Sequence, residues 1–202
     1  MYCNDNPVMF VDPSGHLASA VLGFIGIFVC GLITGFVNVL SKSESETALG
    51  AFVGGFAEGV ISATTLAIGC TVGALTGGAG FVWLGGLIAV GGGFVAGKYG
   101  NALGQLISYG NVDWEIANLN GCFAAVFNLA SYLGLLTIND ILPKISDASF
   151  FSKIMSNAKL SVGGMIVTGY FSLLSRPTLN EFRDEERIKS GKGRFILGYL
   201  FS

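Results

Sequence analysis

Charged residues are scarce in this sequence. Only 12% of its 202 residues are Asp, Glu, Lys or Arg, whereas a typical soluble domain has about 25%. Hydrophobic residues make up 51% of the chain, and glycine alone contributes 31 residues. A surface with so little charge is not that of an ordinary soluble enzyme. The composition instead predicts a chain that is surrounded at least partly by lipid.

The sequence also lacks the residue patterns of the common catalytic and metal sites. His16 is the only histidine, which leaves no residue for a histidine-based nucleophile or a His-containing zinc site in the body of the chain. No phosphate-binding loop and no serine nucleophile elbow is present. The cysteines are far apart and show no CxxC spacing; they are Cys3, Cys30, Cys70 and Cys122. We therefore predict that the chain is not an enzyme and holds no cofactor or metal.

Basic residues are few and unevenly placed. The net charge of −2 argues against nucleic acid as a partner, because phosphate binding needs clustered Lys and Arg. Up to residue 140 the only Lys or Arg residues are Lys42 and Lys98, and the other nine of the 11 follow it. This distribution predicts a membrane-directed body followed by a tail with mixed charge.

Long uncharged segments predict the membrane-spanning helices. Residues 17–41 carry no charge and exceed the roughly 20 residues that a helix needs to cross a bilayer. A secretory signal peptide is the alternative for this segment, but Asp5 and Asp12 precede it where basic residues would be expected. The polar residues 41–47 then predict a loop with helix N-cap candidates.

Apolar sequence resumes at Ala48 and continues, with Glu58 as its only charge, to Lys98. This is too long for one crossing, and we divide it at the glycine-rich residues 76–80, which predicts a hairpin of helices near 48–75 and 81–97. Residues 117–138 are long enough for a fourth span. We expect residues 98–115 to be an interfacial connection with aromatic anchors, namely Tyr99, Tyr109 and Trp114.

The expected fold is therefore all-α, with four glycine-rich helices of membrane-spanning length and one shorter apolar helix. The shorter segment, residues 160–175, would extend for only about 24 Å as a helix, so interfacial or buried placement is as plausible for it as spanning. We divide the chain into residues 1–16, a hydrophobic body at 17–138, and a C-terminal region at 139–202.

Glycines recur at four-residue spacing within the predicted hairpin. Residues four apart lie on one helix face, and glycine there allows two helix backbones to approach closely. Chance spacing in a glycine-rich chain is the alternative for some of these pairs. The predicted helix-packing residues are Gly50, Gly54, Gly55, Gly59, Gly69, Gly73, Gly77, Gly93 and Gly97. Because each glycine also lowers helix stability by about 1 kcal/mol relative to alanine, we expect individually marginal spans.

Three polar residues within the apolar segments are candidates for lining a path through the membrane. Glu58 is the ionisable residue farthest from a segment end, and such groups often mark functional sites; placement near the interface is the alternative. Asn120 and Asn128 share one helix face with Ser131. That face can line a wet path, hydrogen-bond to another helix, or form the polar seam of a buried helix.

A short motif precedes the first apolar segment. It consists of Asn-Pro-Val at residues 6–8 and Val-Asp-Pro-Ser-Gly at residues 11–15. Ordinary turn chemistry produces similar short sequences. Together, however, the two pieces and their spacing resemble the closing motif of the Rhs/YD-repeat associated core, where the shell of a polymorphic toxin is followed by its variable C-terminal effector.

The resemblance implies that Asp12, Pro13 and Gly15 belong to the motif after which self-cleavage frees the effector, with Asp12 as one of a pair of aspartates. His16 stands where the family has Leu, and the upstream partner and the repeat shell are absent. We therefore expect no self-cleavage by this chain alone. Since Met1 stands only five residues before Asn6, we expect either a displaced effector cassette or a truncated reading frame.

From these features we expect an effector that inserts into a target cell's membrane and permeabilises or depolarises it. The expected partners are the lipid bilayer, a cognate immunity protein that is itself membrane-embedded, the Rhs shell in a full-length form, and further copies of this chain. Two alternatives remain open: a hydrophobic translocation or anchor region that carries an unrecognised enzymatic toxin in residues 139–202, and a resident integral membrane protein.

Overall fold

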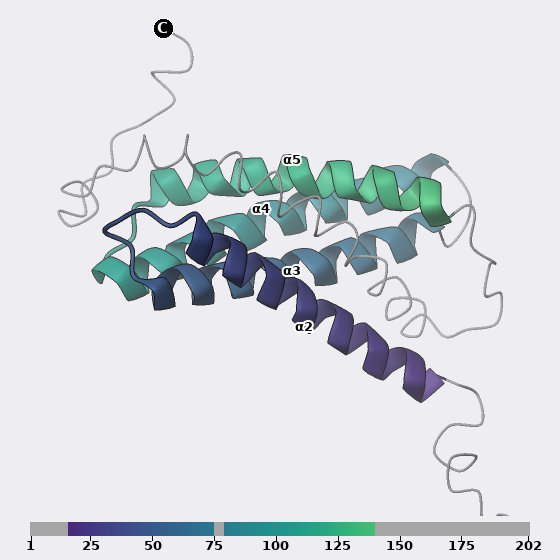
Figure 1. The fold of residues 1–202 in the computed structure, drawn as a ribbon. Helices are drawn as coiled ribbons and strands as arrows, with labels where there is room; N and C mark the ends of the chain where they lie inside the picture. Colours follow the sequence, from purple (N-terminus) through teal and green to yellow (C-terminus); the bar gives the residue numbers. More distant parts are fainter. Residues whose placement is uncertain (1–15, 75–78, 140–202) are drawn as a thin grey trace, which may run out of the picture.

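The computed structural model describes residues 16–74 and 79–139, which form four long helices (Figure 1). They are α2 (His16–Leu40), α3 (Ala48–Ala74), α4 (Ala79–Tyr109) and α5 (Trp114–Asn139). No strand occurs in these two ranges, and each helix is long and apolar enough to cross a membrane. The predicted all-α fold with four membrane-length helices is confirmed. The shorter apolar segment at 160–175 lies outside the described residues.

Local capping explains where the helices begin and end. Thr47 precedes α3, and its hydroxyl accepts a hydrogen bond of 3.0 Å from the Gly50 N–H. Asp113 precedes α5, and its carboxylate accepts a bond of 3.0 Å from the Glu115 N–H. Both are the N-cap arrangement that Thr and Asp favour. After α4, Gly110 has a φ of 75°, a left-handed conformation that glycine adopts easily at a helix C-terminus.

The predicted interfacial connection at residues 98–115 is wrong over most of its length. Helix α4 continues to Tyr109, and only residues 110–113 connect it to α5. The segment is helical because Gly100 and Gly104 pack against α3, while its polar side chains find partners nearby. The Gln105 side-chain amide donates to the side-chain oxygen Oδ1 of Asn101 at 2.6 Å, and its own side-chain oxygen accepts from the Asp113 N–H at 2.6 Å. Local hydrophobicity cannot predict the glycine packing or the Gln105 hydrogen bonds, because both depend on how the folded chain brings residues together.

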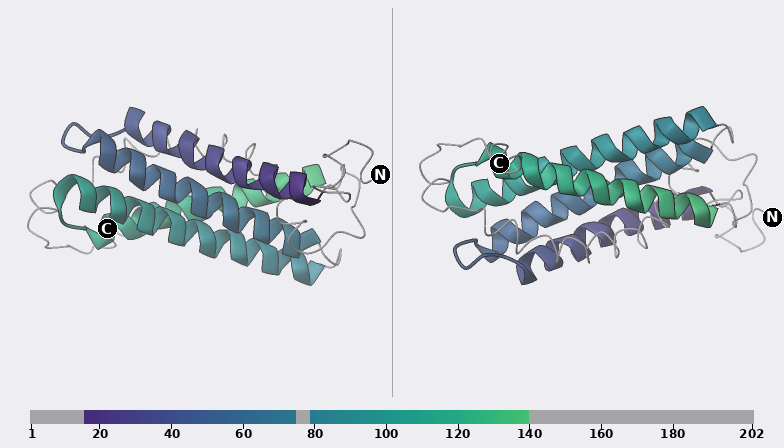
Figure 2. Two further views of the ribbon diagram at one scale, coloured as in Figure 1. Left: turned by 90° about the horizontal axis from the view of Figure 1, so that it is seen from below. Right: turned by 90° about the horizontal axis from the view of Figure 1, so that it is seen from above.

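The helices run up and down as a bundle in which α3 is central (Figure 2). Helix α3 packs against α2 on one side and α4 on the other, and it meets α5 over a smaller area. Helix α5 packs mainly on α4. The expected hairpin is therefore present as the α3–α4 pair, although the four residues 75–78 between its helices lie outside the described residues.

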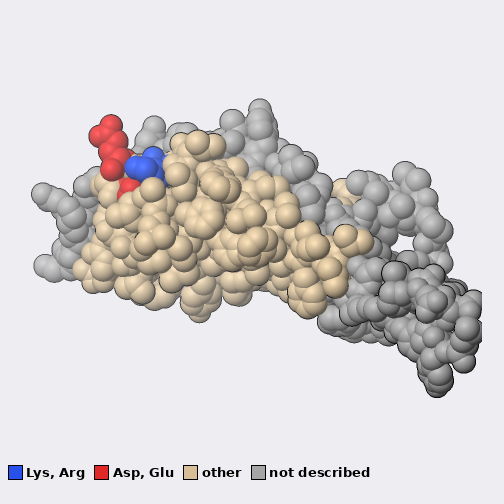
Figure 3. Space-filling model, turned by 60° about the horizontal axis from the view of Figure 1, so that its bottom comes forward, with Lys and Arg blue, Asp and Glu red and all other residues tan. Residues whose placement is uncertain are grey.

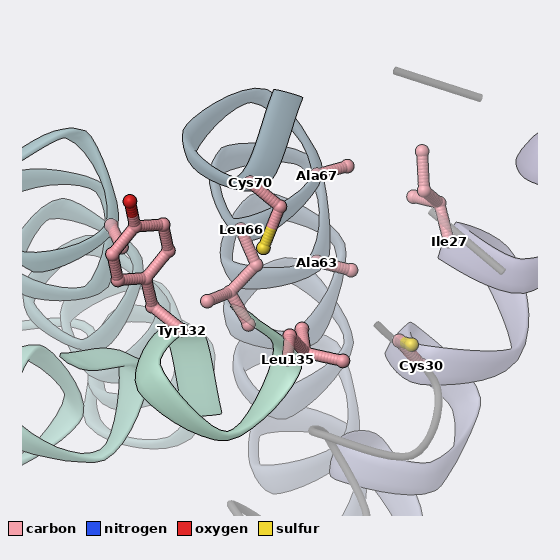
Figure 4. Packing of buried hydrophobic residues seen from close by; sticks show 9 residues of the cluster. Ile27, Cys30, Ala63, Leu66, Ala67, Cys70, Tyr132 and Leu135 are labelled. Carbon is pink, nitrogen blue, oxygen red and sulfur yellow. The ribbon is translucent and has the colours of Figure 1, made fainter. Parts of the chain in front are cut away.

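The buried hydrophobic cluster is made mostly of small side chains (Figure 4). Ala63 and Ala67 of α3 point toward Ile27 and Cys30 of α2. On the other side of α3, Leu66 and Cys70 face Tyr132, which comes from α5. Such a core buries little apolar area per residue, so burial of large side chains does not hold these helices together.

Candidate membrane-contact and helix-packing site

Large apolar side chains cover the outside of the bundle. Phe24, Phe28 and Phe36 of α2 are 57%, 54% and 60% exposed. Leu87 of α4 and Val126 of α5 are 67% and 63% exposed. On the face shown in Figure 3, charged side chains gather at one end and the remaining described surface is uncharged. An exposed apolar surface of this extent is the pattern of a protein whose solvent is lipid.

Polar side chains lie inside the bundle. Two of them bond to the backbone of their own helix: the Thr34 hydroxyl donates to the Cys30 carbonyl at 2.9 Å, and the Thr71 hydroxyl donates to the Ala67 carbonyl at 2.7 Å. In a bilayer, polar groups have to be satisfied within the protein. The buried polar residues of the four helices are Thr34, Asn38, Glu58, Ser62, Thr71, Asn101, Gln105, Asn120, Asn128 and Ser131.

Most of the charged residues that the structure describes occupy one end of the bundle. We call it the polar end and define it as residues 41–47 and 110–115. The connection at residues 41–47 contacts the end of α4 there: the Ser45 hydroxyl lies 3.1 Å from the Tyr109 hydroxyl, and the Thr47 and Ser108 hydroxyls are 3.1 Å apart. The charged residues of the polar end are Lys42, Glu44, Glu46, Asp113 and Glu115.

Together these features indicate a membrane protein in contact with a lipid bilayer. The candidate spans are 20, 26, 28 and 22 residues long, and each meets the length that a helix needs to cross the hydrocarbon core. They are Val21–Leu40, Ala48–Gly73, Val82–Tyr109 and Trp114–Leu135.

Glycines of α3 lie where that helix meets α4. A β-carbon on Gly54 would lie 2.6 Å from the Gly100 carbonyl oxygen and 3.0 Å from the Gly104 Cα. One on Gly50 would lie 2.7 Å from the Gly104 carbonyl oxygen. Farther along, a β-carbon on Gly69 would lie 2.7 Å from the Gly85 carbonyl oxygen. The two backbones are in direct contact at these positions, which leaves no space for a side chain.

Other predicted packing glycines face α2 and α5. A β-carbon on Gly59 would lie 2.6 Å from the Cys30 carbonyl oxygen of α2, and Gly55 is similarly close to the Thr34 carbonyl at 2.7 Å. In α4, Gly93 and Gly97 approach α5, at 2.6 Å from the Ala124 carbonyl oxygen and 2.7 Å from that of Asn120, respectively.

Of the remaining predicted packing glycines, Gly73 is buried near the end of α3, and Gly77 lies outside the described residues. The prediction missed two glycine pairs with the same four-residue spacing. Gly31 and Gly35 of α2 pack against α3, and Gly100 and Gly104 of α4 do so from the other side. Extending the search for that spacing into the first span and beyond residue 97 would have found both pairs.

The three candidate path-lining residues lie in two different helix interfaces. Glu58 is 8% exposed and lies between α3 and α4. A β-carbon built on Gly100 of α4 would be 2.8 Å from the Cβ atom of Glu58. Asn120 and Asn128 lie between α4 and α5. They donate to the Gly97 carbonyl at 2.9 Å and to the Ala89 carbonyl at 3.2 Å. Both asparagines therefore link helices through hydrogen bonds.

No family model, curated protein or solved structure matches this chain. The N-terminal motif with Asp12, Pro13 and Gly15 lies outside the described residues. Its resemblance to the Rhs core therefore stays a prediction. The same holds for the tail at residues 140–202 and any activity it contains.

The glycine contacts predict opposite effects of two alanine substitutions. Gly54→Ala places a methyl group against the backbone of α4, and such overpacking costs about 1–3 kcal/mol. Gly91 is exposed with nothing within 4 Å of its β-carbon position, so Gly91→Ala should stabilise by up to about 1 kcal/mol through helix propensity. Unfolding in detergent micelles, followed by circular dichroism, measures both free energies. Equal effects of the two substitutions would contradict the packing role of Gly54.

The interhelical hydrogen bonds predict a smaller effect. Asn120→Ala removes the bond to the Gly97 carbonyl and should lower the free energy of unfolding by about 0.6 kcal/mol, the average for such bonds in membrane proteins. Asn118→Ala is the matched control, because Asn118 lies on the same helix and is exposed. The same detergent unfolding assay compares them, and an Asn120→Ala variant as stable as Asn118→Ala would show that the bond contributes nothing.

Proposed function

We propose that this chain is the membrane-inserting effector of an Rhs-type polymorphic toxin, which permeabilises or depolarises a target cell membrane without bond-breaking chemistry. One observation supports the membrane part most directly: the described helices present large apolar side chains outward and bury glycine and polar residues. Such a molecule is stabilised by lipid around it and destabilised by water. The N-terminal motif supports the toxin part through its resemblance to the end of an Rhs core.

Glycine-lined interfaces support an inserted form that can rearrange. A helix face of small residues fits another such face closely, whether that face belongs to the same chain or to a second copy. Faces that pack within one chain, such as Gly50 and Gly54 against Gly100 and Gly104, are therefore suited to pack between copies. We propose that association of copies in the bilayer produces the conducting form, with Glu58, Asn120 and Asn128 lining its path.

Buried acceptors support the presence of a hydrated path. The side-chain oxygens of Asn38 and Asn128 are buried and have no hydrogen-bond partner in the described helices. A buried unsatisfied oxygen of this kind costs about 1–3 kcal/mol. Water or a cation that reaches these oxygens in a conducting form would remove that penalty, because both can serve as their missing partner.

The toxin hypothesis implies two further partners. The producing cell needs a cognate immunity protein. Because this protein would have to bind the four helices inside the bilayer, we propose that it is itself membrane-embedded. In a full-length form the Rhs shell would enclose the effector, which keeps its apolar outer surface from water until delivery. The resemblance of residues 6–15 implies both partners.

A resident integral membrane protein is the second candidate, and the close packing of the single chain favours it. All four helices already satisfy much of their polar interior within one bundle, as the Asn120 and Asn128 bonds illustrate. Such a protein would remain stable in the membrane without harming the cell. An enzymatic toxin in residues 139–202 has no supporting observation among the described residues.

Membrane potential separates the effector from the resident protein. Inducible expression of the full chain in bacteria should collapse the membrane potential, reported by a voltage-sensitive dye, before growth stops. Co-expression of the adjacent open reading frame should restore both. The control is a variant of equal abundance that carries Gly54→Leu, which disrupts the α3–α4 contact. Growth arrest at a normal potential would favour the enzymatic alternative, and normal growth would favour the resident protein.

Glu58 predicts the ion selectivity of the path. A carboxylate beside a conducting path attracts cations, so the purified chain in a planar bilayer should give a cation-selective reversal potential under a KCl gradient. Glu58→Gln should move that potential toward zero. Glu44→Gln is the matched control, because Glu44 is exposed in the connection at the polar end. An unchanged reversal potential in Glu58→Gln would remove Glu58 from the path.

A further inference from the structure

Lys98 is the only Lys or Arg within the four described helices. Its ammonium group lies over three aromatic rings, with the nitrogen 5.8 Å from the centroid of Phe94, 5.7 Å from that of Tyr99 and 5.6 Å from that of Trp114. Phe94 and Tyr99 belong to α4, and Trp114 is the first residue of α5. These distances fall within the range of cation–π contacts. We call these four residues the Lys98 cluster.

The Lys98 cluster is at the surface of the bundle. Tyr99 and Trp114 are 52% and 51% exposed, and their rings contact edge to face with 6.4 Å between centroids. Lys98 has no carboxylate partner among the described residues, so its charge is not neutralised by the bundle. Exposed Tyr and Trp beside a Lys are the combination that membrane proteins place at the boundary between hydrocarbon and headgroups.

Trp83 provides a second reference point on the same helix. It is 77% exposed and lies near the start of α4, at the opposite end of the bundle from Trp114. Lys98 follows Trp83 by 15 residues, which corresponds to about 22 Å along a helix. Trp114 opens α5 at the polar end. The levels of Trp83 and Lys98 are thus about 22 Å apart, which is less than the roughly 30 Å of a hydrocarbon core. The long Lys98 side chain extends toward the headgroups, and local thinning of the bilayer accommodates the remaining difference.

We propose that the Lys98 cluster is a phospholipid headgroup site that fixes the depth of the bundle in one leaflet, with Trp83 at the boundary of the opposite leaflet. The Lys98 ammonium has three N–H donors, and it binds a lipid phosphate oxygen from the headgroup side. The rings of Tyr99 and Trp114 lie at the level of the lipid carbonyls. This assignment rests on the membrane insertion proposed above and adds the chemistry and depth of the lipid contact.

The same depth places Glu58 near the membrane surface. Glu58 meets α4 at Gly100, two residues beyond Lys98, so it lies at nearly the same level as the Lys98 cluster. A carboxylate at that level is at the mouth of a path through the bundle and not at its midpoint. At the mouth the carboxylate can attract cations, and its nearness to water lowers the cost of holding a charge in the membrane.

Tryptophan depth tests the assignment. The full chain is reconstituted in phosphatidylglycerol vesicles whose acyl chains carry bromine at either shallow or deep positions. Trp83→Phe leaves Trp114 as the only tryptophan, and Trp114→Phe leaves Trp83. Each lone tryptophan should be quenched more strongly by shallow bromines than by deep ones. Stronger quenching of Trp114 by deep bromines, or no quenching of Trp114 while Trp83 is quenched, would overturn the headgroup site.

A lysine substitution tests the phosphate. In the Trp83→Phe background, Lys98→Gln should reduce the preference of Trp114 for shallow bromines in phosphatidylglycerol vesicles. It should have no effect in vesicles of a galactolipid, which has no phosphate. Lys42→Gln is the matched control, because Lys42 lies in the connection at the polar end, outside the Lys98 cluster. An unchanged Trp114 depth in Lys98→Gln, or an equal change in both lipids, would overturn the phosphate contact.

Dye leakage from the same vesicles separates this proposal from the proposed function. Shallow Trp114 with leakage supports both. Deep Trp114 with leakage overturns the headgroup site alone, whereas shallow Trp114 without leakage overturns permeabilisation alone. Circular dichroism of each variant should give the wild-type helix content, so that a change in depth is not a loss of folding.

Discussion

Direct contact between helix backbones at glycine is the interaction on which the rest of this bundle depends. Lipid tails are as apolar as Leu or Phe, so burying large side chains between helices gains little in a membrane. Close approach replaces that driving force. Gly54 meets Gly100 and Gly104 with no room for a methyl group, and Gly59 meets Cys30 in the same way. Large residues are consequently left for the outside, where lipid solvates them.

Close approach also decides what the polar side chains can do. Once α4 and α5 are in contact at Gly93 and Gly97, Asn120 and Asn128 lie within reach of backbone carbonyls on the neighbouring helix. Glu58 is held against Gly100 for the same reason. The contacts in the interior therefore stabilise the bundle, and the same interior contains the polar residues that we propose to line an ion path. At the surface, Lys98 lies over three aromatic rings and has no acidic partner within residues 16–74 and 79–139.

Much of the fold follows from local patterns. Long segments with almost no charge predict the positions of all four helices, and the polar residues 41–47 predict the turn between α2 and α3. The spacing of Gly50, Gly54, Gly55 and Gly59 indicates which faces are small. Residues 98–109 show where local patterns fail. Their sequence is too polar for a predicted span, and they are helical because α3 and the Gln105 bonds supply partners. The residues of the candidate site could be identified from the sequence. Their positions could not, because the sequence does not show that Glu58 lies in one helix interface and Asn120 and Asn128 in another.

Hydrophobicity and glycine content were sufficient to predict a membrane protein made of helices, because both depend only on how each segment interacts with its solvent. Partner choice among those helices came from the packed structure. A glycine face has no side chain to specify its neighbour, so Gly54 could have met α2, α4 or α5 as far as its sequence shows. Only the crossing of complete helices decides that it meets α4, and that Lys98 reaches Trp114 across the α4–α5 connection.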